Sequence, residues 1–469
     1  MTQRSYKKIK PHLFIILLAI FVLFLKLIFL SHWLEDWDSV QFALALHNFS
    51  VVNHQPHPPG YPLYVLMGKI IYFFIRDDLL SLASLSFISS SLSVVFIYKL
   101  AKQMFDTKTA ILASIMLIFV PIFWIFSQLP LSNIPGFFFY LLIIYEMYKY
   151  HSNLKAMLLI SFLAGLVLGV RATEFPVIIS ILGFIVIKNA NIKYVSILVS
   201  FIIGIIAWFG PVLILTGIGN FHASLSSITG YAADKSSFSN SLFIENILWI
   251  RLEKFIYLFK ISYTVPLLII SFLSLLWLIS KKSLLRNFNY QFLSVWILLY
   301  GILFFTLHMF IYYDLGLPQY TLVILPPLII LVSSILSKYN LLLILIYPLL
   351  VINLVDKSWA YLQHQSQIIP PTIAPVIYVK NNFNPDHTTL VTTFTYRQFQ
   401  YYAPQFENYY SAKNAPNRLK DIVIIDYDNL ISYIPALKKY KIVEKKEFSN
   451  PELIFSRISN TKLYIYIKN

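Results

Sequence analysis

Long apolar runs recur from residue 13 to residue 355, and they constrain this chain more than any other feature. A membrane interior offers no water to backbone groups, so a chain crosses it as α-helices or as a closed barrel. These runs come close to the ~20 residues of a spanning helix. We place the spans at about 13–30, 79–99, 110–128, 134–149, 156–170, 173–187, 195–216, 256–280, 290–312, 318–337 and 340–355. The sequence therefore predicts a mainly α-helical, polytopic membrane protein with about eleven transmembrane helices.

The composition excludes a soluble enzyme. Charged residues make up 12% of the chain and the mean hydropathy is +0.69, whereas soluble proteins carry roughly 25% charged residues. A net charge of +16 by itself suggests a nucleic-acid partner. Most of the basic residues, however, lie between the apolar runs, which is typical of a plasma-membrane protein. The chain has no cysteine, which excludes disulfides and thiol chemistry.

The N-terminal segment predicts the orientation in the cell membrane. Basic residues, from Arg4 to Lys10, precede the first apolar run. That run is longer than the ~7–15 residues of a signal-peptide core, and no small-residue cleavage site follows. We therefore expect a retained anchor with a cytoplasmic N-terminus, which places the loop at about 32–78 on the extracytoplasmic side.

Residues 356–469 have a different composition from the rest of the chain. Charges return after Asp356, and Pro370 and Pro371 interrupt the chain. Short β-rich runs cover 388–395, 422–425 and 463–467, with a helix-like stretch at 430–440. The odd number of spans then predicts a small extracytoplasmic α/β domain at 356–469, after a transmembrane domain at 1–355.

The first external loop carries the strongest candidates for chemistry. Asp36 and Asp38 precede an apolar stretch that we expect to be a short helix, with Asp38 as its N-cap and Gln41 three residues further on. One alternative is that Asp38 only caps this helix. The other is a functional carboxylate, acting as a general base toward a hydroxyl or holding a divalent cation against a phosphate. Both aspartates can serve one site only if the segment that carries them is extended.

A second part of this loop reads His57-Pro-Pro-Gly-Tyr-Pro-Leu-Tyr64. Its prolines cannot continue a helix and predict a rigid turn, in which His57 is either a functional group or a solvated loop residue. Together with Asp38-Ser-Val-Gln-Phe, this string resembles the first-loop signature of bacterial GT-C membrane glycosyltransferases related to protein O-mannosyltransferases. Phe123-Trp124, Gly165–Arg171 and Pro318-Gln319-Tyr320 follow in the family's order, so the resemblance covers about 30–340.

The resemblance implies a GT-C-like fold and an inverting transfer of a sugar, mannose in the relatives, from a polyprenyl-phosphate donor. The acceptor would be a hydroxyl of a protein, a glycan or a lipid, reached on the extracytoplasmic side of the membrane. The family's catalytic aspartate falls on Asp38, while His57, Tyr61 and Gln41 would support the loop. Relatives often have Glu at Gln41, an acid at Asn133 and Arg at Gln319. Magnesium or manganese binding at Asp38 therefore stays an open expectation.

Arg171 is a candidate for binding the donor phosphate. A guanidinium at the end of an apolar span is costly in lipid unless it is paired or faces an aqueous cavity. Glu174, three residues away, is one explanation, and a planar clamp on phosphate oxygens is the other. Lys235, in the long loop at 217–255, is a second candidate for the same phosphate.

Two other functions remain consistent with a multi-span chain. A lipid or polysaccharide transporter, or flippase, predicts ionisable residues deep within the spans and interrupted helices in two matching halves. A non-catalytic assembly subunit with the same fold would explain the departures at Gln41, Asn133 and Gln319. A glycosyltransferase explains best why carboxylates gather in one external loop.

Overall fold

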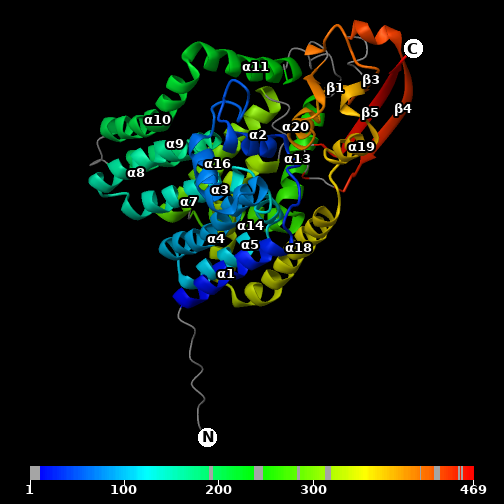
Figure 1. Ribbon diagram of the computed structural model, residues 1–469. Helices are drawn as coiled ribbons and strands as arrows, with labels where there is room; N and C mark the ends of the chain where they lie inside the picture. The colour runs from blue at the N-terminus through cyan, green and yellow to red at the C-terminus, as the bar shows by residue number, and fades with distance from the viewer. Residues whose placement is uncertain are drawn as a thin grey trace. The chain divides into compact units, whose positions relative to one another are not determined.

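The computed structural model describes residues 11–189, 194–236, 247–282, 286–311, 318–411, 414–426, 434–452, 455 and 458–469. Its contacts divide the chain into two units, Met1–Leu30 with Ser50–Ala360, and Ser31–Phe49 with Tyr361–Asn469. Segment 31–49, which we assigned to the transmembrane domain, therefore folds with the C-terminal residues. The first unit is helical, and the second contains the strands β1 to β5 (Figure 1).

The first unit has the helical, multi-span architecture that the apolar runs predict. Its helices are α1 (Pro11–Ile28), α3 (Pro62–Ile75), α4 (Asp78–Met104), α5 (Thr107–Phe119), α6 (Pro121–Phe126), α7 (Asn133–Tyr150), α8 (Leu154–Val167), α9 (Phe175–Lys188), α10 (Tyr194–Thr216), α11 (Ile218–Ser236), α13 (Ile247–Tyr263), α14 (Val265–Ser280), α16 (Phe288–Thr306), α17 (Leu325–Leu336) and α18 (Asn340–Gln367), the last of which continues into the second unit. Within the described ranges, five helical segments are long and apolar enough to span a membrane, or six if the bent pair α13 and α14 is one span. Four more apolar helices are shorter, so the count of eleven stays a prediction.

Several predicted spans are interrupted. The run at 110–128 breaks where Pro121 begins α6, because proline has no backbone N–H to continue the preceding helix. The run at 256–280 is bent by 100° between α13 and α14, where Thr264 adopts a φ of 63°. The run at 318–337 begins as the 3₁₀ helix Pro318–Ile324 before α17. These interruptions create irregular backbone inside the helical unit.

Helices α8 and α10 pack through two glycines. A Cβ added to Gly165 would lie 2.0 Å from the carbonyl oxygen of Phe201, and one added to Gly204 would lie 2.0 Å from that of Phe162. Small residues at such contacts let two membrane helices approach closely. The glycines therefore fix the distance between these helices.

We expect Gly204→Ala to destabilise the first unit by about 1–3 kcal/mol, because the new methyl group forces the two backbones apart. Gly183→Ala in α9 is the matched control, since an added Cβ there meets nothing within 4 Å. Thermal unfolding of the purified protein in detergent measures both changes. Equal unfolding temperatures for the two variants would contradict the close contact.

The second unit is built on a mixed five-stranded sheet of order β2-β1-β3-β5-β4. Its strands are β1 (Thr388–Thr392), β2 (Glu407–Tyr410), β3 (Ile422–Ile425), β4 (Tyr440–Ser449) and β5 (Asn460–Lys468). β2, β1 and β3 pair in parallel, whereas β3, β5 and β4 pair antiparallel. Buried residues alternate between the two faces of the sheet, with Leu390 and Ile424 on one side and Val391 and Val423 on the other.

The predicted β-rich runs correspond to β1, β3 and β5, which confirms an α/β fold for these residues. β2 and β4 were not predicted. β4 is an edge strand whose residues are mostly exposed and rich in Lys and Glu, so it lacks the apolar pattern of a buried strand. The predicted helix at 430–440 lies partly outside the described residues. For the described residues the prediction is wrong, since Pro435–Lys439 forms a 3₁₀ helix and Tyr440 begins β4.

Candidate functional site

Asp36, and not Asp38, is the N-cap of helix α2 (Trp37–His47). Its backbone is extended, with φ −81° and ψ 146°, and its carboxylate accepts the N–H of Asp38 at 2.8 Å. The prediction that Asp38 caps this helix is therefore wrong. The helix begins earlier than predicted because Asp36 satisfies an N–H of its first turn and because Trp37 packs within the second unit.

This correction changes the two interpretations of the aspartates. Asp38 lies in the first turn of α2, so the alternative that it only caps the helix is excluded. The carboxylate of Asp36 is turned onto the helix end, so the two aspartates do not lie side by side on an extended segment. Asp38 is half-buried, and Gln41, on the following turn, is buried.

C-terminal side chains surround the segment that precedes α2. Tyr402 accepts the Leu34 N–H at 2.8 Å through its phenol oxygen. The Glu35 carbonyl accepts the Thr372 hydroxyl at 3.0 Å and the Gln398 amide at 2.9 Å. The Glu35 carboxylate accepts the Gln365 amide at 2.8 Å. Residues more than 300 positions apart in the sequence thus meet at Glu35.

Aromatic contacts flank these hydrogen bonds. The Trp37 ring lies 6.4 Å from that of Tyr396 and 6.0 Å from that of Tyr410, measured between centroids. The guanidinium of Arg397 lies 5.8 Å from the Trp37 ring. The helix that carries Asp38 is therefore packed at its first residue against α20 (Tyr396–Tyr402) and β2.

Burial raises the pKa of the Glu35 carboxyl from its ordinary value of 4.5 to about 7, despite the opposing hydrogen bond from Gln365, and the nearby charge of Asp36 adds to the rise. Tyr361 is also within electrostatic reach of Glu35. Because the folded protein holds this proton more tightly than the unfolded chain does, the contribution of Glu35 to stability falls as the pH rises from about 4.5 to 7.

We expect Glu35→Gln to remove a pH-dependent loss of stability on the order of 3 kcal/mol. The wild-type unfolding temperature should fall between pH 5 and pH 8 by more than that of the variant. Glu444→Gln, at an exposed carboxylate of the same unit, is the control. Parallel pH profiles for wild type and Glu35→Gln would contradict the raised pKa.

The proline-rich loop at 56–62 is ordered by contacts of its own. The Nε2 atom of His57 lies 3.1 Å from the Tyr61 hydroxyl, and Tyr61, with a φ of 46°, precedes α3. At the start of α3, the Leu63 N–H donates to the Gly169 carbonyl at 3.1 Å. The first-loop motif and the turn that precedes Arg171 thus lie together in the first unit.

Arg171 is buried and paired. Its Nη1 donates to the Ser132 hydroxyl at 3.0 Å, and its Nε lies 3.4 Å from Glu174 Oε1. Gly136 lets the side chain pass, because an added Cβ would lie 2.7 Å from the Arg171 Cδ. The Glu174 pair that the sequence suggested is therefore present. The pair does not exclude a phosphate contact, since a guanidinium carries five N–H donors.

Aromatic donors hold the 3₁₀ helix at Pro318–Ile324. Four consecutive backbone carbonyls accept hydrogen bonds from side chains. The Tyr320 carbonyl accepts from the Tyr300 hydroxyl, that of Thr321 from the Tyr263 hydroxyl, that of Leu322 from the Tyr140 hydroxyl, and that of Val323 from the Trp296 indole N–H. Irregular backbone at membrane depth requires such partners. Gln319, where relatives often have Arg, lies in the first turn of this segment and is partly exposed.

Lys26 and Arg251 are buried cations that we did not single out from the sequence. Lys26 in α1 is fully buried, its Nζ lies 5.9 Å and 5.8 Å from the rings of Phe123 and Trp124, and it has no hydrogen-bond partner among the described residues. Arg251 in α13 is also fully buried and donates to the Met309 carbonyl at 2.7 Å. Lys26 could have been singled out from the sequence, because a lysine within an apolar run is unusual. Arg251 could not, because it lies in the segment 217–255, which we assigned as a loop.

The remaining residues that the sequence singled out are Asn133 and Lys235. Asn133 is buried at the start of α7, and the side chain of Lys235 lies outside the described residues. Over the described ranges, no three His, Asp or Glu side chains form a group that could hold a metal ion. Magnesium or manganese binding at Asp38 stays a prediction.

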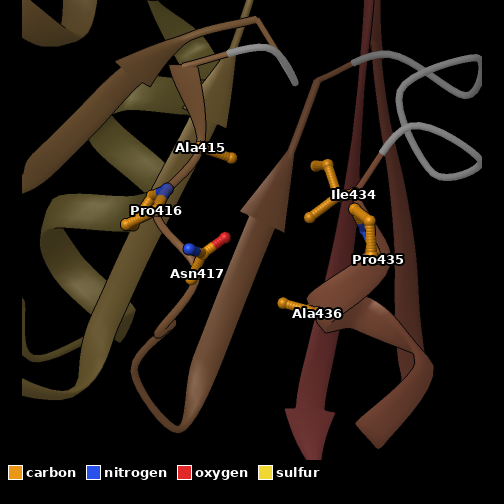
Figure 2. Close-up of a pocket in the computed structure, with 6 residues that line it drawn as sticks. All are labelled: Ala415, Pro416, Asn417, Ile434, Pro435 and Ala436. Atoms are coloured by element: carbon orange, nitrogen blue, oxygen red, sulfur yellow. The ribbon is translucent and has the colours of Figure 1, made fainter.

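A cavity of about 250 Å³ lies in the second unit. Its lining side chains are Ala415, Pro416, Asn417, Ile434, Pro435 and Ala436 (Figure 2). Only Asn417 offers a polar side chain. None of the predicted site residues lines this cavity.

Comparison with known proteins supports the resemblance. Residues 56–214 match the family described as dolichyl-phosphate-mannose-protein mannosyltransferase. No curated protein sequence matches the chain. The matched range contains the proline-rich loop and Arg171 and includes no residue of the second unit.

Solved structures show the same fold at low identity. ArnT from Cupriavidus metallidurans bound to undecaprenyl phosphate is 12% identical, with a TM-score of 0.58 over 97% of each chain. The Archaeoglobus fulgidus oligosaccharyltransferase in its apo form is 12% identical, with a TM-score of 0.58 over 95% of this chain and 74% of that one. The archaeal oligosaccharyltransferase AglB from Archaeoglobus fulgidus, in complex with an inhibitory peptide and a dolichol-phosphate, matches with a TM-score of 0.56, also at 12% identity over 95% of this chain and 74% of that one. Residues 56–214 of this multi-pass membrane protein are thus similar to the dolichyl-phosphate-mannose-protein mannosyltransferases, and the chain shares the fold of ArnT and of the archaeal oligosaccharyltransferase.

Proposed function

We propose that the chain is an inverting glycosyltransferase that moves a sugar from a polyprenyl-phosphate donor to an acceptor hydroxyl on the extracytoplasmic side of the cell membrane. The observation that carries this proposal is the contact between Leu63 and Gly169, which brings the family's proline-rich loop to the turn that precedes the buried Arg171. Relatives in fold were solved with undecaprenyl phosphate and with a dolichol-phosphate, which supports a lipid-phosphate donor.

The proposed reaction gives each residue a defined role. Asp38 accepts the proton of the acceptor hydroxyl, whose oxygen attacks the anomeric carbon on the face opposite the phosphate. The bond between that carbon and the phosphate oxygen breaks, and polyprenyl phosphate leaves with its added negative charge. Arg171 stabilises this charge through its planar donors. His57, Tyr61 and Gln41 support the loop and the helix, and Lys235 is a further phosphate ligand. No step is assigned to a magnesium or manganese ion.

The test of this function uses cells and purified protein. Glycolipids and glycoproteins of a deletion strain and its parent are compared, which identifies the acceptor if transfer occurs. Purified protein in vesicles is then given polyprenyl-phosphate mannose and the acceptor, and should release polyprenyl phosphate and form an inverted glycoside. Movement of the lipid between leaflets without any glycoside would favour the flippase alternative, which the buried Lys26 supports.

The proposed orientation is tested separately. Reporter fusions after Gln55 and after Asn469 should both indicate the extracytoplasmic side, because the basic N-terminal segment is expected to stay in the cytoplasm. As a control, a second reporter that is active only in the cytoplasm is fused at the same two positions and should give no signal. A cytoplasmic signal from either fusion would overturn the orientation.

A further inference from the structure

The segment that leads into α2 has no regular secondary structure between Ser31 and Asp36. A buried backbone without helix or strand partners must find its hydrogen bonds elsewhere. At Leu34 and Glu35 those bonds come from C-terminal side chains, as described above. The position of this segment is therefore set by residues more than 300 positions away in the sequence.

The side chains that hold the segment are themselves mostly buried. Gln398 is 1% exposed, Thr372 is 3% exposed and Gln365 is 8% exposed. Burying two amides and a hydroxyl is costly unless each makes its hydrogen bond. All three direct a donor to Glu35, which makes this residue the centre of a buried polar network. Packing alone would be served equally well by apolar side chains.

The network lies close to the proposed catalytic carboxylate. Glu35 directly precedes Asp36, whose carboxylate accepts the N–H of Asp38 at 2.8 Å. Displacement of Glu35 would therefore move the cap and the first turn of α2 with it. A displacement of 1 Å at a reacting group costs about 100-fold in rate, so the hold on Glu35 matters for transfer even though it touches no substrate.

We propose that Gln365, Thr372, Gln398 and Tyr402 are positioning residues that hold Leu34 and Glu35 and thereby set the place of Asp38. The C-terminal domain is then a functional part of the active site and not an appended module. This inference rests on the proposed role of Asp38. It assigns the four side chains no contact with the donor or the acceptor.

Thr372 offers the cleanest test, because valine has its shape without the hydroxyl. Thr372→Val should lower kcat by about 10- to 100-fold, with the donor KM within about twofold of wild type, because the donor phosphate is bound elsewhere. Thr372→Ser keeps the hydroxyl and should restore most of the rate. Thr461→Val is the matched control, since Thr461 is equally buried and its hydroxyl has no hydrogen-bond partner among the described residues.

Hydrogen exchange of the α2 peptide provides a readout that does not depend on activity. Amides of residues 37–47 should exchange faster in full-length Thr372→Val than in Thr461→Val. Unchanged exchange and full transfer in Thr372→Val, with Asp38→Asn inactive, would overturn the positioning role alone. Faster exchange with full transfer in both Thr372→Val and Asp38→Asn would instead overturn the role of Asp38 in the proposed function.

Discussion

Asp38→Asn protein should fold normally and transfer sugar at least about 100-fold more slowly than wild type, the loss typical of a missing general base. The substitution removes the charge and keeps the size of the side chain. Helix α2 should be unaffected, because its cap is the carboxylate of Asp36. Initial rates at saturating donor and acceptor, with monodispersity as the measure of folding, separate a catalytic defect from a structural one.

The matched control for Asp38 is its neighbour two residues earlier. Asp36→Asn keeps an oxygen that caps the helix and should retain most of the transfer rate. Asp36→Ala loses the cap, at a cost of about 1 kcal/mol, and should slow transfer by loosening α2. Near-normal transfer by Asp38→Asn would refute the catalytic assignment, and an inactive Asp36→Asn protein would move the role to Asp36.

Replacement of Arg171 should impair use of the donor. Arg171→Lys keeps the charge but loses the planar arrangement of donors, and a lost charge-assisted hydrogen bond of about 1.5–3 kcal/mol raises the donor KM by roughly 10- to 100-fold. Transfer measured over a range of donor concentrations tests this, with the acceptor KM as the internal control. Unchanged donor KM in Arg171→Lys would contradict the phosphate role.

Complete removal of Arg171 requires a compensating change. Arg171→Ala leaves Glu174 buried without its cation, which typically destabilises a protein by about 3–5 kcal/mol. The double variant Arg171→Met with Glu174→Gln neutralises both members of the pair and should fold. Full transfer by this double variant at limiting donor would show that the pair is structural only.

Local patterns account for the parts of the fold that the sequence predicted. Apolar runs of span length identify the helices of the first unit, because in lipid the backbone must satisfy itself within each segment. A continuous run of β-branched residues identifies β3, whose side chains are buried on both faces of the sheet. The proline-rich string from Pro58 to Pro62 marks a non-helical loop, because proline restricts its own backbone and that of its neighbour.

The interruptions of the helices could not be predicted, because they depend on partners that are distant in the sequence. The 3₁₀ helix at Pro318–Ile324 has the apolar composition of an ordinary span. Its carbonyls are satisfied by Tyr140, Tyr263, Trp296 and Tyr300, which come from three other helices. Only packing brings those donors to this backbone.

The candidate site also combines features that follow from the sequence with features that only the tertiary structure decides. The roles proposed for Asp38, His57 and Arg171 come from the sequence by itself, because these residues stand in short motifs whose residue types and spacing are local properties. Tertiary structure alone decided that Asp36 is the cap and that segment 31–49 folds with the C-terminal residues. The physical reason lies at Glu35, whose hydrogen bonds come from side chains more than 300 residues further along the chain, a distance over which local propensities carry no information.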